Sequence, residues 1–138
     1  MQGGIRVTHM SIDGEDGRLP GVAEDCTITL TVTAERESNA RLFLGVSEGA
    51  ATPIFVVMHG TTVPEGETTF EVRIEHVPLP PKRFFLWFGA WDMATKDEIT
   101  PWQPIGPLTM HGRRRLDPVP KAIVRLSPVY VAAHWSRT

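Results

Sequence analysis

Apolar and polar residues alternate with a period of two along most of the chain. The clearest case is residues 26–33, in which Cys26, Ile28, Leu30 and Val32 alternate with threonines. Because successive side chains of a β-strand point to opposite faces, this pattern predicts a strand with one buried face. Comparable patterns predict strands at residues 5–12, 42–46, 54–59, 70–75, 105–110, 122–126 and 129–134.

Residues 83–92 form a strongly aromatic stretch whose length and composition favour a strand over a buried helix. In a strand, its apolar side chains divide between two faces: Phe84, Leu86, Phe88 and Ala90 on one, and Phe85, Trp87, Gly89 and Trp91 on the other. One face can fill a core. The second face still carries three aromatic rings, and it must be either covered or used for binding.

Proline is frequent, with 12 residues, and it excludes long helices because a proline inside a helix costs about 3 kcal/mol. Only residues 34–41 are expected to form a short helix. Turn sequences such as Asp13-Gly14 and residues 64–66 separate the predicted strands. About eight to ten short strands at this spacing predict an all-β fold, an antiparallel β-sandwich of the immunoglobulin-like or jelly-roll kind.

A chain of 138 residues is long enough to enclose one hydrophobic core. We therefore expect residues 1–138 to form a single sandwich domain. Within it, residues 112–138 are expected to be a loop followed by one or more C-terminal strands. These strands either pack on the domain or exchange with a second protomer.

Charge and composition narrow the classes of function. The formal net charge is −2, which argues against general binding to phosphate backbones, so we expect no nucleic-acid partner. The basic run Arg113-Arg114-Arg115 is interpreted as a solvated turn. Cys26 is the single cysteine and excludes an internal disulfide. Neither a signal peptide nor an apolar run of about 18 residues is present, which favours a soluble cytoplasmic protein.

Three sequence features resemble catalytic or metal-binding motifs only superficially. Ser47 lies in a G-x-S-x-G pattern, but Pro53 opens another strand where a nucleophile elbow needs a helix, so we interpret it as a hairpin turn. The five histidines lie singly, without the close pairs of zinc ligands. The acidic turn with Asp13, Glu15 and Asp16 lacks the distal glutamate of a calcium loop. We expect no cofactor, no metal and no enzymatic activity.

Several segments occur in an order that matches a known family: residues 5–17, 24–30, 43–49, 70–74, 77–81, 84–92 and 129–135. The strongest is the Leu-Pro segment at residues 77–81, which leads into the aromatic strand and Asp92. In these segments the chain resembles the C-terminal carbohydrate-binding domain of Wzt-type proteins, the ATP-binding subunits of O-antigen polysaccharide ABC exporters. The prolines at residues 78–81 replace the glycine turn that is usual there. The absence of a G-x-x-x-x-G-K-[ST] motif limits the resemblance to the recognition module.

The resemblance implies a noncatalytic module that binds a finished bacterial surface polysaccharide of the O-antigen type and presents it for export. It implies a location in the cytoplasm, at the inner face of the inner membrane. The implied partners are the polysaccharide and the ATPase domain and membrane subunit of an ABC exporter. It also implies a homodimer.

Sugar rings bind aromatic faces through their C–H surfaces, and their hydroxyls need polar partners at the ring edge. The candidate carbohydrate-binding residues are therefore Phe85, Trp87, Trp91, Trp102, Asp92, Gln103, Arg83 and Arg73, with Glu71 as a further polar candidate. Trp102 joins this platform if its strand pairs beside the aromatic strand. Two alternatives stay open. The rings form a second core layer under the last strand and Trp135, or the same fold docks a partner protein through its aromatic face or an edge strand.

Overall fold

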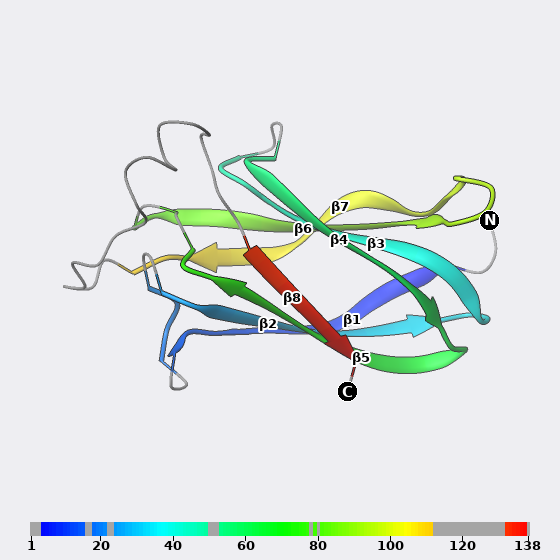
Figure 1. Cartoon of the computed structure of the whole chain (residues 1–138). Coiled ribbons are helices and arrows are strands. Elements are labelled where there is room, and N and C mark those ends of the chain that lie inside the picture. The colour runs from blue at the N-terminus through cyan, green and yellow to red at the C-terminus, as the bar shows by residue number, and fades with distance from the viewer. Residues whose placement is uncertain are drawn as a thin grey trace.

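The computed structural model describes residues 4–15, 18–21, 24–49, 53–77, 79, 81–111 and 132–137. In these residues eight strands form two four-stranded sheets, which Figure 1 shows as two layers. The strands are β1 (Ile5–Asp13), β2 (Cys26–Ala34), β3 (Ser38–Ser47), β4 (Phe55–Val63), β5 (Gly66–Glu75), β6 (Arg83–Asp92), β7 (Glu98–Thr109) and β8 (Ala132–Arg137). The predicted all-β sandwich is confirmed.

Some sequence predictions lie outside the described residues. They are the strand at residues 122–126, the basic run at residues 113–115, the loop at residues 112–120, the first part (residues 129–131) of the strand at residues 129–134, and Asp16 of the acidic turn. The described part of the chain contains no helix long and apolar enough to cross a membrane.

The strand order is β1-β2-β5-β8 in one sheet and β4-β3-β6-β7 in the other. All pairings between these strands are antiparallel. β1, β2 and β5 correspond to strands A, B and E of an immunoglobulin-like sandwich, and β3, β6 and β7 correspond to strands C, F and G. β8 lies beside β5, in the place of strand D. The arrangement therefore leaves β4 and β7 as the edges of the second sheet.

The core lies between the two sheets and follows the period-two pattern. On β6, Phe84, Leu86, Phe88 and Ala90 are at most 1% exposed. These side chains meet the inward side chains of the opposite sheet, among which Phe70 of β5 is fully buried. Burying one such side chain stabilises the fold by about 1.5–3 kcal/mol. This inward packing forces the intervening residues of β6 onto the outer face.

Residues 34–41 do not form the predicted helix. β2 continues to Ala34 and β3 begins at Ser38, so only residues 35–37 connect them. Ala34 and Ala40 are both buried at strand positions, and the Glu35 N–H donates a hydrogen bond to the carbonyl oxygen of Gly4. Packing of these small side chains against the core outweighs the weak helical preference of so short a segment.

Cys26 lies at the start of β2 and is 2% exposed, as expected for a small core residue. Burial disfavours the charged thiolate and, with a smaller contribution from the negative charge of Asp13, raises the pKa of the thiol to about 12. The cysteine is therefore a packing residue that stays protonated at neutral pH.

Candidate functional site

The outer face of the β4-β3-β6-β7 sheet carries a cluster of aromatic rings, which we call the aromatic face: Phe43, Phe85, Trp87, Trp91 and Trp102. Trp91 is 45% exposed and Trp102 is 36% exposed. β7 pairs with β6, so Trp102 joins the rings of the aromatic strand as predicted. The sequence did not show which face of residues 83–92 points inward. In the structure the face with Phe84 and Phe88 is core, and the face with Trp87 and Trp91 is the outer surface.

Two pairs of rings contact each other on this face. Phe43 of β3 and Trp91 of β6 have ring centroids 4.8 Å apart and planes tilted by 58°. Trp87 of β6 and Trp102 of β7 are stacked, with centroids 6.0 Å apart and planes 13° apart. Such contacts fix ring orientations and contribute about 0.5–1.5 kcal/mol each beyond burial. The rings are thus held in place before any ligand arrives.

Two glycines make room for Trp102 to lie across the sheet. In the pairing of β3 with β6, Gly45 lies opposite Trp87, and Gly89 lies opposite Phe43. A Cβ atom on Gly45 would lie 2.6 Å from Cη2 of Trp102, and one on Gly89 would lie 3.1 Å from its Cε3. Side chains at these two positions would push the indole away. These two glycines therefore allow the Trp102 ring to lie close to the backbone, and their role is not backbone flexibility.

Ser47 at the end of β3 fixes the orientation of Trp87. The indole Nε1–H of Trp87 donates a hydrogen bond of 2.7 Å to Ser47 Oγ, and the Ser47 hydroxyl donates to the carbonyl oxygen of Gly49. Ser47 is fully buried, and the chain continues from it into the β3–β4 hairpin. The hairpin interpretation of the G-x-S-x-G pattern is confirmed, and its serine orients a tryptophan.

Three grooves adjoin the rings. One of about 240 Å³ is lined by Gly49, Phe85, Trp87 and Pro104. A second of about 400 Å³ is lined by Phe43, Pro53, Val56, Gly89, Trp91, Glu98, Thr100 and Trp102. A third of about 330 Å³ is lined by Arg41, Phe43, Met58, Trp91, Asp92, Met93 and Lys96. Their apolar floors with a few polar groups are typical of small-ligand sites.

Two of the predicted polar residues lie on or beside the aromatic face. The Arg83 guanidinium lies 5.7 Å from the centre of the Phe85 ring, a cation–π contact. Asp92 closes the turn after β6, where its Oδ1 accepts hydrogen bonds from the N–H groups of Ala94 and Thr95. The Thr95 N–H, followed by the Ala94 N–H, lowers the pKa of Asp92. Asp92 therefore shapes the third groove as a charged carboxylate.

Gln103 does not share this face. Its Nε2 donates to the carbonyl oxygen of Pro101, and its side chain lines a cleft of about 450 Å³ between β7 and residues 6–10 of β1. Because Gln103 follows Trp102 directly in β7, the two side chains point to opposite sides of the strand. Gln103 therefore does not belong to the aromatic face.

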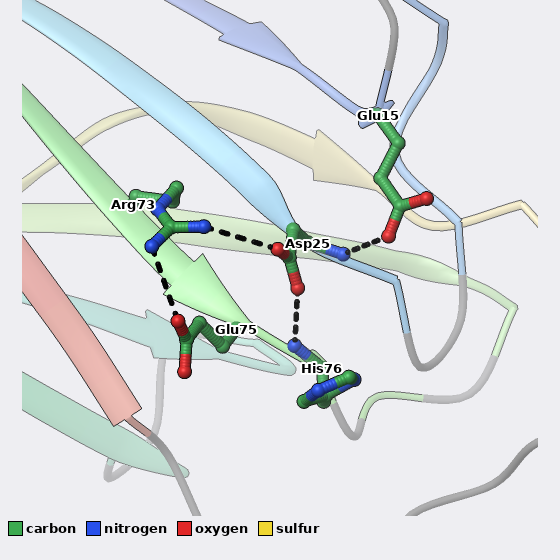
Figure 2. Close-up of polar contacts among 5 residues, drawn as sticks. All are labelled: Glu15, Asp25, Arg73, Glu75 and His76. Atoms are coloured by element: carbon green, nitrogen blue, oxygen red, sulfur yellow. Dashed lines mark hydrogen bonds and ion pairs between the residues drawn. The ribbon is translucent and has the colours of Figure 1, made fainter.

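Arg73 and Glu71 lie on β5, in the opposite sheet. Figure 2 shows Arg73 between two carboxylates, with ion pairs of 3.2 Å to Asp25 and 3.1 Å to Glu75. Asp25 also accepts a hydrogen bond from the backbone N–H of His76. This cluster ties the end of β5 to the start of β2, a structural role, and Arg73 is not brought together with the aromatic face.

One solved structure with a similar fold is the crystal structure of the C-terminal domain of Wzt, with a TM-score of 0.60 over 83% of this chain and 77% of that chain. The chain has the fold of the Wzt C-terminal domain. The sequence identity is 13%, so the likeness lies in the fold and not in matched site residues. No protein-family model and no curated protein matches the sequence. The resemblance predicted from sequence segments is confirmed for the fold.

In this Wzt-like sandwich the last strand does not cover the aromatic face. Trp135 of β8 stacks on His59 of β4, with ring centroids 5.2 Å apart and planes 12° apart. It packs against the core from the opposite sheet. The alternative in which Trp135 covers the rings of β6 is therefore wrong.

The site also includes residues that sequence reasoning missed. Phe43, Arg41 and Met58 line the third groove. Gly45 makes room for Trp102 of the second groove, and Ser47 orients Trp87 of the first. A signal for Phe43 was present, because assigning Leu42 and Leu44 to the core places Phe43 on the opposite face.

Among the described residues, no group of three or more His, Cys, Asp or Glu side chains could hold a metal ion.

Proposed function

We propose that this chain is a noncatalytic recognition module that binds a bacterial surface polysaccharide of the O-antigen type on its aromatic face. The observation that carries the proposal is a set of partly exposed rings, held in two contacting pairs and flanked by grooves on one sheet. The Wzt-like fold supports it, because the family that the sequence resembles binds polysaccharide with this domain.

The mechanism is reversible binding. The C–H faces of sugar rings stack on Trp91, Trp102 and Phe43, while Glu98 and Lys96 at the groove walls meet hydroxyl groups. The preformed ring pairs lower the ordering cost that a flexible site would incur. Shallow grooves still bury only part of a ligand, so we expect a dissociation constant of about 10 μM to 1 mM for one site.

The same proposal places the module in the cytoplasm, beside the ATPase domain and membrane subunit of an ABC exporter. There it would hold the finished polymer for transport. The homodimer implied by the resemblance stays a prediction, which multi-angle light scattering tests. Two linked sites would raise avidity for a repeating polymer.

An array of bacterial surface polysaccharides, probed with the full chain, tests the proposal. We expect saturable binding to at least one polymer, with weaker binding in Trp91→Ala. Leu19→Ala is the matched control, because Leu19 is 61% exposed but lies outside the aromatic face. Both variants should keep the β-sheet circular dichroism spectrum. Absence of binding to every polymer by a folded chain would refute the proposal and favour a protein-docking role for the same face.

A further inference from the structure

The three grooves of the aromatic face lie in series. The second and third grooves share Phe43 and Trp91, which stand between them. The first groove is lined by Trp87, and the second by Trp102, and these two indoles stack on each other. Each ring pair is therefore a partition between two neighbouring grooves.

The order of the grooves follows the direction of β6. After Arg83, the outward residues of the strand are Phe85, Trp87, Gly89 and Trp91, in this order. At about 3.3 Å per residue, Phe85 and Trp91 are roughly 20 Å apart along the strand. This span exceeds the length of a single sugar ring, so one terminal sugar cannot occupy the whole series.

We propose that the aromatic face binds at least three consecutive sugar residues of a polysaccharide, one in each groove, and so recognises a stretch of the chain rather than a single terminal sugar. This inference rests on the proposed function and specifies its ligand. Trp87 with Trp102, and Phe43 with Trp91, stack against the sugar rings that border each partition.

Charged groups are distributed unequally along the series. Among the described residues, the lining of the first groove has no charged side chain, and that of the second has Glu98. The third has Arg41, Asp92 and Lys96. Polar discrimination is therefore concentrated at the end near the turn after β6. Since the two ends differ, the bound polymer lies in one direction.

Fragments of defined length test the inference. The best-binding polymer of the array is hydrolysed by mild acid, and fragments of one to about six sugar residues are titrated by calorimetry. We expect affinity to rise about three- to tenfold for each added residue up to three, because one ring stacked on an aromatic side chain typically contributes that much. Equal affinities of the one-residue and longer fragments would overturn the inference.

A second arm separates recognition of chain ends from recognition of internal stretches. Polymer fractions of different mean length compete for binding at equal mass concentration. Recognition of internal stretches predicts equal potency for long and short fractions, because the number of internal sites per gram hardly changes. Potency that falls in proportion to chain length would show that only ends bind, and would overturn the inference while leaving the proposed function standing.

The variant Trp91→Ala tests whether the fragments bind in these grooves, since Trp91 stands between the second and the third. The Trp87–Trp102 partition between the first and second grooves stays intact in this variant. We therefore expect it to keep the gain from the second sugar residue and to lose the gain from the third, and Leu19→Ala to retain both. A Trp91→Ala variant that keeps the full length dependence would place the ligand elsewhere. If neither the chain nor any variant binds polymer or fragments, the proposed function itself fails, an outcome distinct from binding without length dependence.

Discussion

Replacing Gly45 with alanine should displace Trp102 from the aromatic face. The added Cβ would lie 2.6 and 2.7 Å from Cη2 and Cζ2 of the Trp102 ring. Carbon atoms normally pack at about 3.5–4.0 Å, so the ring must retreat by roughly 1 Å. The other close atom is the backbone oxygen of Phe55, 3.3 Å away, which the β3–β4 pairing holds in place. The indole is therefore the group that moves.

The cost of this displacement should be moderate. Trp102 lies on an edge strand and is 36% exposed, so its ring can turn toward solvent. The variant then loses the stacking on Trp87, about 0.5–1.5 kcal/mol, together with part of the apolar contact of the ring. We expect unfolding to be easier by about 1–2 kcal/mol, compared with about 3–5 kcal/mol for removing a core aromatic such as Phe88.

Urea denaturation measures the change in unfolding free energy, and near-ultraviolet circular dichroism reports the paired indoles. Gly4→Ala is the control, because a Cβ there meets nothing within 4 Å. We expect Gly45→Ala to lose the signal of the stacked pair and to bind polysaccharide more weakly, while Gly4→Ala matches the parent chain. An unchanged indole signal with unchanged stability would refute the reasoning that the glycine holds a place for Trp102.

Three further predictions concern single polar groups. Ser47→Ala removes the acceptor of the Trp87 indole N–H, so urea denaturation should show a loss of about 1–3 kcal/mol; no loss would mean that the hydroxyl does not orient the ring. The pKa of Asp92 is lowered below its ordinary 3.8. The charged carboxylate therefore stabilises the folded chain above that pH, and this stabilisation disappears as the pH falls through the lowered pKa. The stability gap between the parent and Asp92→Asn should shrink over this range in acid titrations, and a constant gap would contradict it. Cys26, with a pKa raised to about 12 by burial, should react with a disulfide reagent at pH 8 only when urea unfolds the chain, and rapid reaction of the folded chain would contradict its burial.

Period-two patterns predicted most of the fold because side chains inside a sandwich are sorted by burial alone. The strand around Cys26 and the two faces of residues 83–92 are direct cases, and both are confirmed. The alternating pattern does not show which strands become neighbours. Arg73 was therefore predicted to share a binding site with the aromatic strand, although β5 belongs to the opposite sheet.

The start of β7 was predicted too late in the sequence because this strand contains prolines. The sequence indicated a strand only from residue 105, but β7 begins at Glu98 and includes Pro101, Pro104 and Pro107. A proline cannot donate a ladder hydrogen bond, and edge strands tolerate it because one side of such a strand is unpaired. β7 is an edge of its sheet and pairs with β6 in an irregular register. Edge position depends on the tertiary fold and is not visible in a local pattern.

The most direct test of polysaccharide binding on the aromatic face is a nitrogen-15 NMR titration that follows the four tryptophan indole N–H signals. Trp87, Trp91 and Trp102 lie on the face, and Trp135 lies on the opposite sheet as an internal control. With the polymer that binds best on the array, we predict saturable shifts of the first three signals and a stationary Trp135. Shifts confined to Trp135, or four stationary signals while the polymer binds, would contradict the account.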